Sequence, residues 1–414
     1  MAATNSDIIR ELRGNWQVLL VAFVCLLFAF SAPAFFVPFL YPEVIREFGW
    51  SREQAVLLAS SKYLTGSIVA IVVGRFIDVI GVRLVLITVS ALGGFALLSL
   101  LWTSGLTGYY LAGVMLGFSG SGTMVAIKVL VSRTFHAAQG TAMGIALLST
   151  SLGAIMVPFA ATWLMSVYGW RIGSALLSAG VWFIALPLMI FYLTEKTFDD
   201  RSAASGRDSV PAAIDWSVVR EFAASRSFWL IFIAVFCAGF VDQSLIQHQV
   251  LYLGEDLQLS AIVVATVVSA TGIIAFITRP LVGSLFDRKS TRGVALGYLV
   301  LGAACIIALG AANPLLLALF VVFRAVGHSA VLLDTLVLAK HRFGLTHIGI
   351  LIGVYTAAVN IGFAVGPPVV ARLYMLTGSY VVPFLACAGV GLLAAAVLLP
   401  IKPVYWLQSR TGDK

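Results

Sequence analysis

The sequence contains few charged residues and no sizeable polar region. Only 11% of its 414 residues are Asp, Glu, Lys or Arg, whereas soluble domains carry about 25%. Sixty per cent of the residues are apolar. This composition excludes a soluble globular protein. It also leaves no room for a separate catalytic domain, so we expect neither enzymatic activity nor catalytic residues.

Features that would indicate a metal, a disulfide or a nucleotide are also absent from the sequence. The four cysteines lie one by one in apolar segments, without the spacing of a metal site or a disulfide framework. The Gly-x4-Gly-Lys motif that binds nucleotide phosphates is missing, which argues against direct drive by ATP. We therefore expect no metal and no cofactor.

Long apolar segments fill most of the chain instead. A transmembrane helix needs about 20 mostly apolar residues. The first run, which starts at Trp16, is longer than the core of a signal peptide and therefore predicts a membrane span. The sequence predicts an all-α membrane protein with twelve transmembrane helices, at about 16–40, 55–73, 84–103, 108–131, 140–166, 173–193, 227–253, 261–285, 293–311, 314–339, 347–371 and 378–401.

The distribution of positive charge predicts the orientation of these spans. The net charge of +8 might suggest a nucleic-acid partner, but 18 of the 26 Lys and Arg residues fall in segments on one side of the predicted membrane. Cytoplasmic loops carry such an excess. We expect both termini in the cytoplasm, a multi-pass protein of the plasma or bacterial inner membrane in contact with lipid, and no nucleic acid.

The two halves of the chain repeat each other at an offset of 209 residues. Gly144, Gly153 and Pro158 recur as Gly353, Gly362 and Pro367. Since each half has six spans, the copies run in parallel, and a substrate site is expected between them near the membrane midplane. The predicted organisation is a six-helix bundle over 1–193, a cytoplasmic linker over 194–226 that ends in a short interfacial helix, and a second bundle over 227–414.

A short charged motif follows the second span and again the eighth. It comprises Gly74, Asp78 and Arg83 in the first copy and Gly283, Asp287 and Arg288 in the second. The motif resembles the gating motif of the major facilitator superfamily, and the resemblance covers essentially the whole chain. It implies a monomer of two bundles that alternately open a central site to each side. In this interpretation the glycines permit tight packing, and Asp and Arg form an ion pair that holds one gate state.

Six charged residues fall inside the predicted spans, and four of them are positive. They are Lys62, Lys128, Arg279, Arg324, Asp242 and Asp334. Ionisable residues within spans mark substrate or ion pathways. A positive excess favours an anionic substrate. Lys62 and Lys128 lie near helix ends, and we expect their ammonium groups to extend to the interface.

Arg279 is the strongest candidate for substrate binding. It has no acid one helical turn away, where Ala275, Phe276, Val282 and Gly283 stand, and its repeat counterpart is Ala70. The guanidinium group binds a carboxylate through two parallel hydrogen bonds. The alternative is a packing arginine that pairs with an acid on another helix.

A second group of residues is a candidate for proton coupling. Arg324 and His328 share a face, and Asp334 follows on the same helix. Asp242 stands in an unusually polar span that is expected to line a water-filled cavity. Asp242, His328 or Asp334 is expected to carry a proton, or Asp242 and Arg324 form a structural ion pair.

Neutral residues complete the predicted site. Asn360 is placed to give a neutral hydrogen bond, with Tyr355 nearby in the same span, and His328 is also expected to contact the substrate. Phe276 stands one turn from Arg279, and Phe28 belongs to an apolar face of the first span that would contact a short carbon chain. The alternative for such phenylalanines is plain helix packing.

The segment Phe276-Ile-Thr-Arg279-Pro-Leu-Val-Gly283 resembles the monocarboxylate transporter family, in which an arginine of this span holds the substrate carboxylate. The resemblance implies uptake of lactate or pyruvate with a proton. The chain departs from that family at Ala275, where an acid is usual, and in lacking a lysine in its first span. Alternatives are an organic-anion or dicarboxylate exchanger and a drug/proton exporter of the same superfamily.

Overall fold

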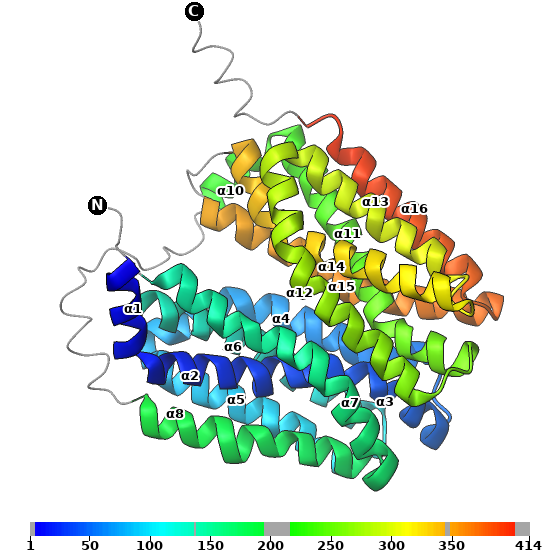
Figure 1. The fold of residues 1–414 in the computed structure, drawn as a ribbon, viewed down its shortest axis with the longest axis horizontal. Helices are drawn as coiled ribbons and strands as arrows, with labels where there is room; N and C mark the ends of the chain where they lie inside the picture. Colours follow the sequence, from blue (N-terminus) through cyan, green and yellow to red (C-terminus); the bar gives the residue numbers. More distant parts are fainter. Residues whose placement is uncertain (1–4, 136–137, 194–215, 344–347, 402–414) are drawn as a thin grey trace, which may run out of the picture. The chain divides into compact units, whose positions relative to one another are not determined.

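The computed structural model describes residues 5–135, 138–193, 216–343 and 348–401, in which every regular element is a helix (Figure 1). In the first half the α-helices are α1 (Asn5–Gly14), α2 (Trp16–Cys25), α3 (Ala32–Phe48), α4 (Arg52–Ile80), α5 (Val82–Ser99), α6 (Leu106–Thr134), α7 (Gln139–Ala179) and α8 (Leu186–Tyr192). In the second half they are α10 (Trp216–Ala223), α11 (Arg226–Leu251), α12 (Ala261–Lys289), α13 (Thr291–Ala308), α14 (Pro314–Phe343), α15 (Ile348–Thr377) and α16 (Val381–Leu398).

Within the described ranges, eleven helical stretches are long and apolar enough to cross a membrane. Some combine several elements: α2, a π-helical turn at Leu26–Ser31 and α3 form one stretch of 33 residues. The longest stretch, Thr141–Tyr192, has 52 residues and contains the non-helical Gly169. That break lies between the predicted spans 140–166 and 173–193. The eleven stretches therefore overlap all twelve predicted spans, with differences of up to three residues at the ends of several spans.

The backbone carries the same repeat as the sequence. Positive φ angles occur in the described part of the chain at six residues, and these form three pairs at the 209-residue offset: Gly49 with Gln258, Gly81 with Ser290, and Gly169 with Gly378. Side chains disfavour a positive φ by about 1–2 kcal/mol, so it is adopted where the fold requires it. The duplicated twelve-helix fold is thus confirmed.

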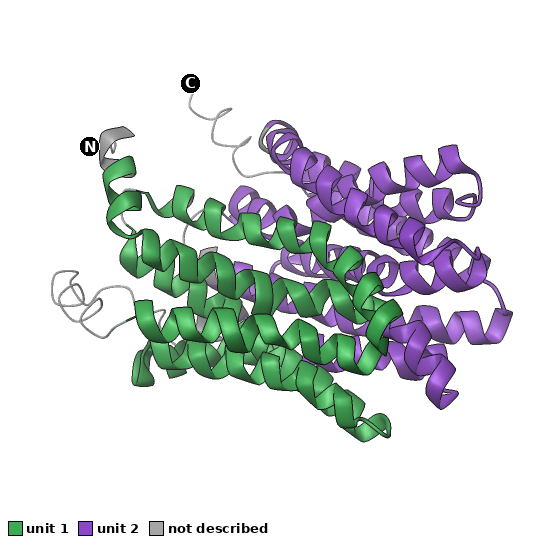
Figure 2. Ribbon diagram, turned by 60° about the horizontal axis from the view of Figure 1, so that its bottom comes forward, with its two compact units in different colours: residues 1–39, 65–212 green, residues 40–64, 213–414 purple. Residues whose placement is uncertain are grey.

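Contacts divide the chain into two compact units (Figure 2). The first unit contains residues 1–39 and 65–212, and the second contains 40–64 and 213–414. Residues 40–64, the end of α3 and the start of α4, therefore pack with the second half of the sequence. The division into bundles at 1–193 and 227–414 remains a prediction. Most of the predicted linker lies outside the described residues, but α10 lies at its end, where a short helix was expected.

In the second unit, glycines bring α15 very close to α11. A Cβ atom on Gly362 would overlap the carbonyl oxygen of Phe236, and one on Gly366 would overlap that of Phe240. Small residues allow such backbone contact between membrane helices. Because Gly362 is part of the sequence repeat, the duplication supplies one of the contacts that hold α11, the helix of Asp242, in place.

Candidate functional site

A buried ion cluster joins α11 to α14 inside the second unit. Oδ1 of the fully buried Asp242 accepts a hydrogen bond from Nη1 of Arg324 at 3.3 Å. Oδ2 of the same carboxylate lies 3.0 Å from Nδ1 of His328. Arg324 and His328 are one turn apart on α14, and for this reason both reach the same acid. The structure thus brings together three of the residues considered for proton coupling.

The charge of this cluster depends on whether it holds an additional proton. Arg324 keeps its positive charge at any physiological pH, so with an ionised Asp242 the two form a neutral pair. A proton bound by His328 or by Asp242 gives the cluster a net positive charge. Since Asp242 is fully buried and Arg324 is only 3% exposed, little water screens that change.

A ladder of amides and phenols continues from Asp242 along α11. The Gln243 amide donates a hydrogen bond to the Tyr63 hydroxyl at 2.7 Å, and the Gln247 amide donates to Gln243 at 2.9 Å. The Tyr41 hydroxyl in turn donates to Gln247. Tyr41 and Tyr63 belong to residues 40–64 of the second unit. Sequence analysis did not select these tyrosines, because their partners lie about 200 residues away.

Asp334 has very different surroundings. It is fully buried, and its Oδ2 accepts a hydrogen bond from the Tyr298 hydroxyl at 2.6 Å. Among the described residues no side chain bonds Oδ1, and none of the Lys, Arg or His side chains lies within ion-pair distance. Asp334 is therefore a buried carboxyl group with a phenol, rather than a cation, as its partner.

Arg279 lies on α12 where that helix packs against α14. The Ser329 hydroxyl of α14 donates to the carbonyl oxygen of Ala275 at 3.2 Å, and Thr278 lies 3.4 Å from the same hydroxyl. The Arg279 side chain is partly buried, and Phe276 is 44% exposed. The helix that carries Arg279 thus packs, at Ala275 and Thr278, against α14, the helix that also carries Arg324 and His328.

The remaining predicted binding residues are dispersed. Tyr355 is buried, its ring packs 5.6 Å from that of Phe228, and its hydroxyl has no hydrogen-bond partner among the described residues. Asn360 is partly buried on the same helix. Phe28 belongs to the first unit and lies against Gly180, where a Cβ atom would overlap its ring. This contact is helix packing, the alternative considered for Phe28.

The first copy of the gating motif differs in detail from expectation. Helix α4 continues to Ile80, so Asp78 belongs to its last turn rather than to a loop. The Asp78 carboxylate pairs with Arg133 of α6 at 3.0 Å, while Arg83 donates to the carbonyl oxygen of Ile190 at 3.2 Å. The partner of Asp78 is therefore an arginine outside the motif. A Cβ atom on Gly74 would meet no atom within 4 Å, so tight packing does not explain this glycine here.

The second copy also ends in a helix. Helix α12 extends to Lys289, and the backbone turns at Ser290, as it does at Gly81 in the first copy. A Cβ atom on Gly283 would lie at an ordinary 3.9 Å from Leu333, and Arg288 is exposed. The side chain of Asp287 lies outside the described residues.

A cluster that sequence analysis missed surrounds Arg52 in the second unit. Its Nη1 atom lies 2.6 Å from Oδ2 of Asp256 and donates to the Tyr380 hydroxyl at 3.0 Å. The guanidinium carbon lies 3.9 Å from the centre of the Tyr374 ring, whose hydroxyl donates to Asp256 at 2.8 Å. Burial raises the pKa of Tyr380 above its usual value although Arg52 opposes this, so Tyr380 remains a neutral phenol.

Two weaker ion pairs accompany this cluster. Arg46 lies 3.5 Å from Glu255, and Arg372 lies 3.7 Å from Glu53. Their side chains are 34–64% exposed, so each contributes at most about 1 kcal/mol. Together with Arg52 they connect residues 40–64 to the second half of the chain. A movement that separates these segments has to break all three pairs.

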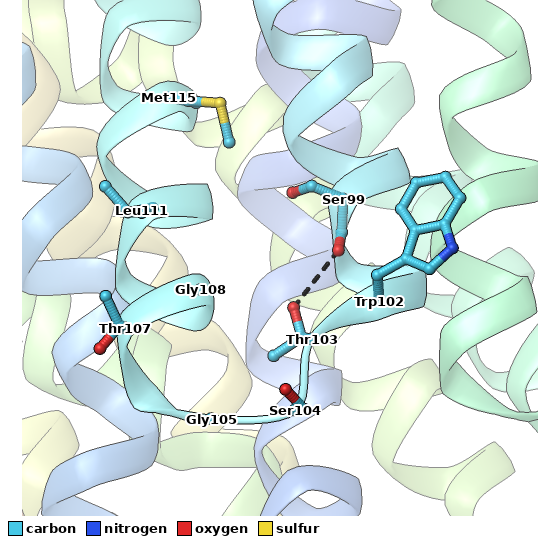
Figure 3. Close-up of a pocket in the computed structure, with 9 residues that line it drawn as sticks. All are labelled: Ser99, Trp102, Thr103, Ser104, Gly105, Thr107, Gly108, Leu111 and Met115. Carbon is cyan, nitrogen blue, oxygen red and sulfur yellow. Dashed lines mark hydrogen bonds between the residues drawn. The ribbon is translucent and has the colours of Figure 1, made fainter.

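A recess of about 320 Å³ opens between the ends of α5 and α6 in the first unit (Figure 3). Trp102, Leu111 and Met115 line it together with Ser99 and Thr103, which are hydrogen-bonded. None of its nine lining residues is a predicted site residue or a charged one. The recess therefore gives no evidence about an anionic substrate.

Comparison with known proteins identifies a family and similar folds. The model of the Major Facilitator Superfamily matches residues 18–338 and 250–407. The crystal structure of a variant of the peptide transporter POT, in complex with sulfate, has a TM-score of 0.70 at 16% identity over 94% of both chains. A bacterial homologue of the human lysosomal transporter Spinster, inward-facing and unoccupied, has a TM-score of 0.70 at 15% identity over 97% of both chains. No curated protein sequence matches significantly.

Proposed function

Because the chain belongs to the Major Facilitator Superfamily and is a multi-pass membrane transporter, we propose that it carries a small monocarboxylate such as lactate or pyruvate together with a proton. The observation that carries the anion proposal is Arg279, partly buried in a membrane-length helix with no acid one turn away. A guanidinium group inside a transmembrane helix is energetically costly unless it faces a cavity, a protein partner or an anion.

The buried ion cluster supports the proton part of the proposal. The chain has alanine at position 275, where the monocarboxylate transporter family has an acid, so another group has to carry the proton. Asp242 and His328 lie 3.0 Å apart, a hydrogen-bond distance over which a proton can be exchanged. Asp334 is the second buried carboxyl group and the alternative carrier.

The remaining parts of the proposal follow from the sequence. The excess of Lys and Arg in alternate loops supports cytoplasmic termini and a cell membrane, plasma or bacterial inner. We further propose that the bundles at 1–193 and 227–414 move against each other, with 194–226 as their tether, and that a monomer is sufficient. The Arg52–Asp256 ion pair, which links residues 40–64 to the second half of the chain, would have to break in any movement that separates these segments.

The proposal is tested by uptake of radiolabelled lactate into proteoliposomes with and without an inward proton gradient. Arg279→Ala and Arg279→Lys are compared with the wild type, and Arg292→Ala, which removes an exposed cation from the first turn of α13, is the control. We expect gradient-driven uptake in the wild type and the control. The rate of lactate uptake should fall at least tenfold in both Arg279 variants, because neither an alanine nor an ammonium group reproduces the paired hydrogen bonds.

Two results would contradict the proposal. Wild-type uptake by Arg279→Lys would exclude a bidentate contact at this position. Absence of lactate uptake by the wild type would leave the family assignment intact and direct attention to other organic anions and to drug efflux.

A separate measurement addresses coupling. Asp242→Asn preserves the shape of the side chain and removes its charge, so lactate exchange should persist while acceleration by a pH gradient disappears. An unchanged acceleration would shift the role to Asp334, for which Asp334→Asn is the matched variant.

A further inference from the structure

A second buried cation, Lys62, belongs to the first repeat. Its side chain keeps only 9% of its accessible surface, although a snorkelling lysine was expected to reach the membrane interface. Helix α4 begins at Arg52, so Lys62 lies ten residues, or about 15 Å, along that helix. The ammonium group is therefore enclosed by protein.

Within the described residues, Lys62 has neither a hydrogen bond nor an ion pair. The ammonium group makes a cation–π contact with the ring of the adjacent Tyr63, whose centre lies 5.0 Å from Nζ. A cation–π contact of this kind offsets only part of the cost of removing an ammonium group from water. The ring alone therefore leaves the charge only partly compensated.

Several acids of the second unit are engaged with groups other than Lys62. Asp242 immediately precedes Gln243, the partner of Tyr63. The Asp242 carboxylate, however, is bound by Arg324 and His328. Elsewhere in the described part of this unit, Glu53 pairs with Arg372, Asp256 with Arg52, Glu255 with Arg46, and Asp334 with Tyr298.

We propose that Lys62 is a binding site for an anionic group, chiefly a carboxylate, of the transported substrate. The proposal rests on the proposed function in taking the substrate to be an organic anion, and it adds a cation from the first repeat to Arg279 from the second. The hydrogen bond from Gln243 fixes the position of Tyr63 beside the ammonium group. A carboxylate bound there supplies a negative charge to Lys62, which forms no ion pair with any of the described residues.

This role predicts an unusual combination of stability and binding. Lys62→Met removes an uncompensated buried charge and keeps most of the side-chain volume, so the variant should unfold at a higher temperature than the wild type in the absence of anion. A lysine with a structural partner would give the opposite result. Lys62→Arg keeps the charge and should retain binding.

The experiment is thermal unfolding of the purified full chain in detergent, with titration of sodium lactate or, as an anion without a carboxylate, sodium sulfate. Anion binding to the folded protein raises the unfolding temperature. We expect lactate to stabilise the wild type, Lys62→Arg and the control Lys128→Met, which removes an exposed cation of α6. For Lys62→Met we expect a higher unfolding temperature in the absence of anion. We also expect its stabilisation to require at least tenfold more lactate than that of the wild type.

Each outcome supports or overturns the assignment. A response of Lys62→Met equal to that of the wild type, a lower unfolding temperature of this variant in the absence of anion, or a wild type that neither anion stabilises would overturn it. A response to sulfate but not to lactate that disappears in Lys62→Met would support an anion site at Lys62 and contradict the monocarboxylate proposal. Loss of lactate uptake in Arg279→Ala, with lactate stabilisation unchanged in Lys62→Met, would support the monocarboxylate proposal and contradict an anion site at Lys62.

Discussion

The two repeats share their backbone but not their buried charges. Each bends to a positive φ at three corresponding positions. Yet Asp242, Arg324 and Asp334, all buried in the second repeat, correspond to the uncharged Pro33, Met115 and Val125 of the first. Conversely, Lys62 of the first repeat corresponds to Thr271. The duplication thus supplies the scaffold, and each copy has acquired its own ionisable groups.

This difference indicates which contacts the fold needs and which the function needs. The first repeat folds with apolar or neutral residues at the positions of the ion cluster, so the scaffold does not require charges there. Buried ion pairs are often no more stabilising than well-packed apolar residues of similar volume. We therefore propose that the cluster in the second repeat serves transport rather than folding, and the following variants test that proposal.

The largest effect is expected when one member of the buried pair is removed. Asp242→Leu leaves Arg324 buried without its acid and should lower the free energy of unfolding by about 3–5 kcal/mol. Adding Arg324→Met, the residue of the first repeat, should restore most of that loss. Thermal or denaturant unfolding in detergent measures both values. A double variant as unstable as the single one would mean that the scaffold itself requires the charges.

An intermediate effect is expected at the second buried acid. Tyr298→Phe removes the hydroxyl that donates to Asp334, leaving the carboxyl group without a side-chain partner among the described residues. The cost should be about 1–3 kcal/mol, and less than that of Asp242→Leu. The same unfolding assay compares the two. A larger loss for Tyr298→Phe would show that Asp334, rather than Asp242, holds the second repeat together.

A smaller effect of opposite sign is expected at a shared backbone turn. Gln258 adopts a φ of 55° where the first repeat has Gly49 at 68°. Gln258→Gly should stabilise the protein by about 0.5–1 kcal/mol, because relief of backbone strain exceeds the entropy lost by glycine. A Cβ atom at Gly49 would meet no other atom within 4 Å, so Gly49→Gln should destabilise the protein through backbone strain, by a similar amount. Equal signs for the two changes would argue against equivalent turns.

The smallest effect is expected at the exposed pair of the gating motif. Arg133, the partner of Asp78, corresponds in the repeat to Arg342. Since the Asp78–Arg133 pair is 31–45% exposed, Arg133→Ala should change stability by no more than about 1 kcal/mol. Arg342→Ala should have an equally small effect on unfolding, and both should alter the uptake rate to the same extent. Unequal changes in rate would indicate that the two gates have diverged.

Local sequence patterns identified the scaffold because its causes are local. Apolar runs of about 20 residues predicted twelve spans, and the structure contains helices over all of them. The offset of 209 was visible in glycines and prolines, and Gly169 and Gly378 indeed break the helices in both copies. The break at Ser290 was less evident because serine rarely adopts a positive φ.

The sequence by itself determined the membrane class, the duplication, the superfamily and the ionisable residues that stand within the spans. Only the tertiary structure decided their partners: Arg324 and His328 for Asp242, Tyr298 for Asp334, Arg133 for Asp78, and Asp256 for Arg52. All of these partners lie between 36 and 204 residues apart in the chain. Hydrophobic periodicity records which face of a helix is buried, whereas pairing depends on which helices pack together and at what depth, so the enclosure of Lys62 emerged only with the fold.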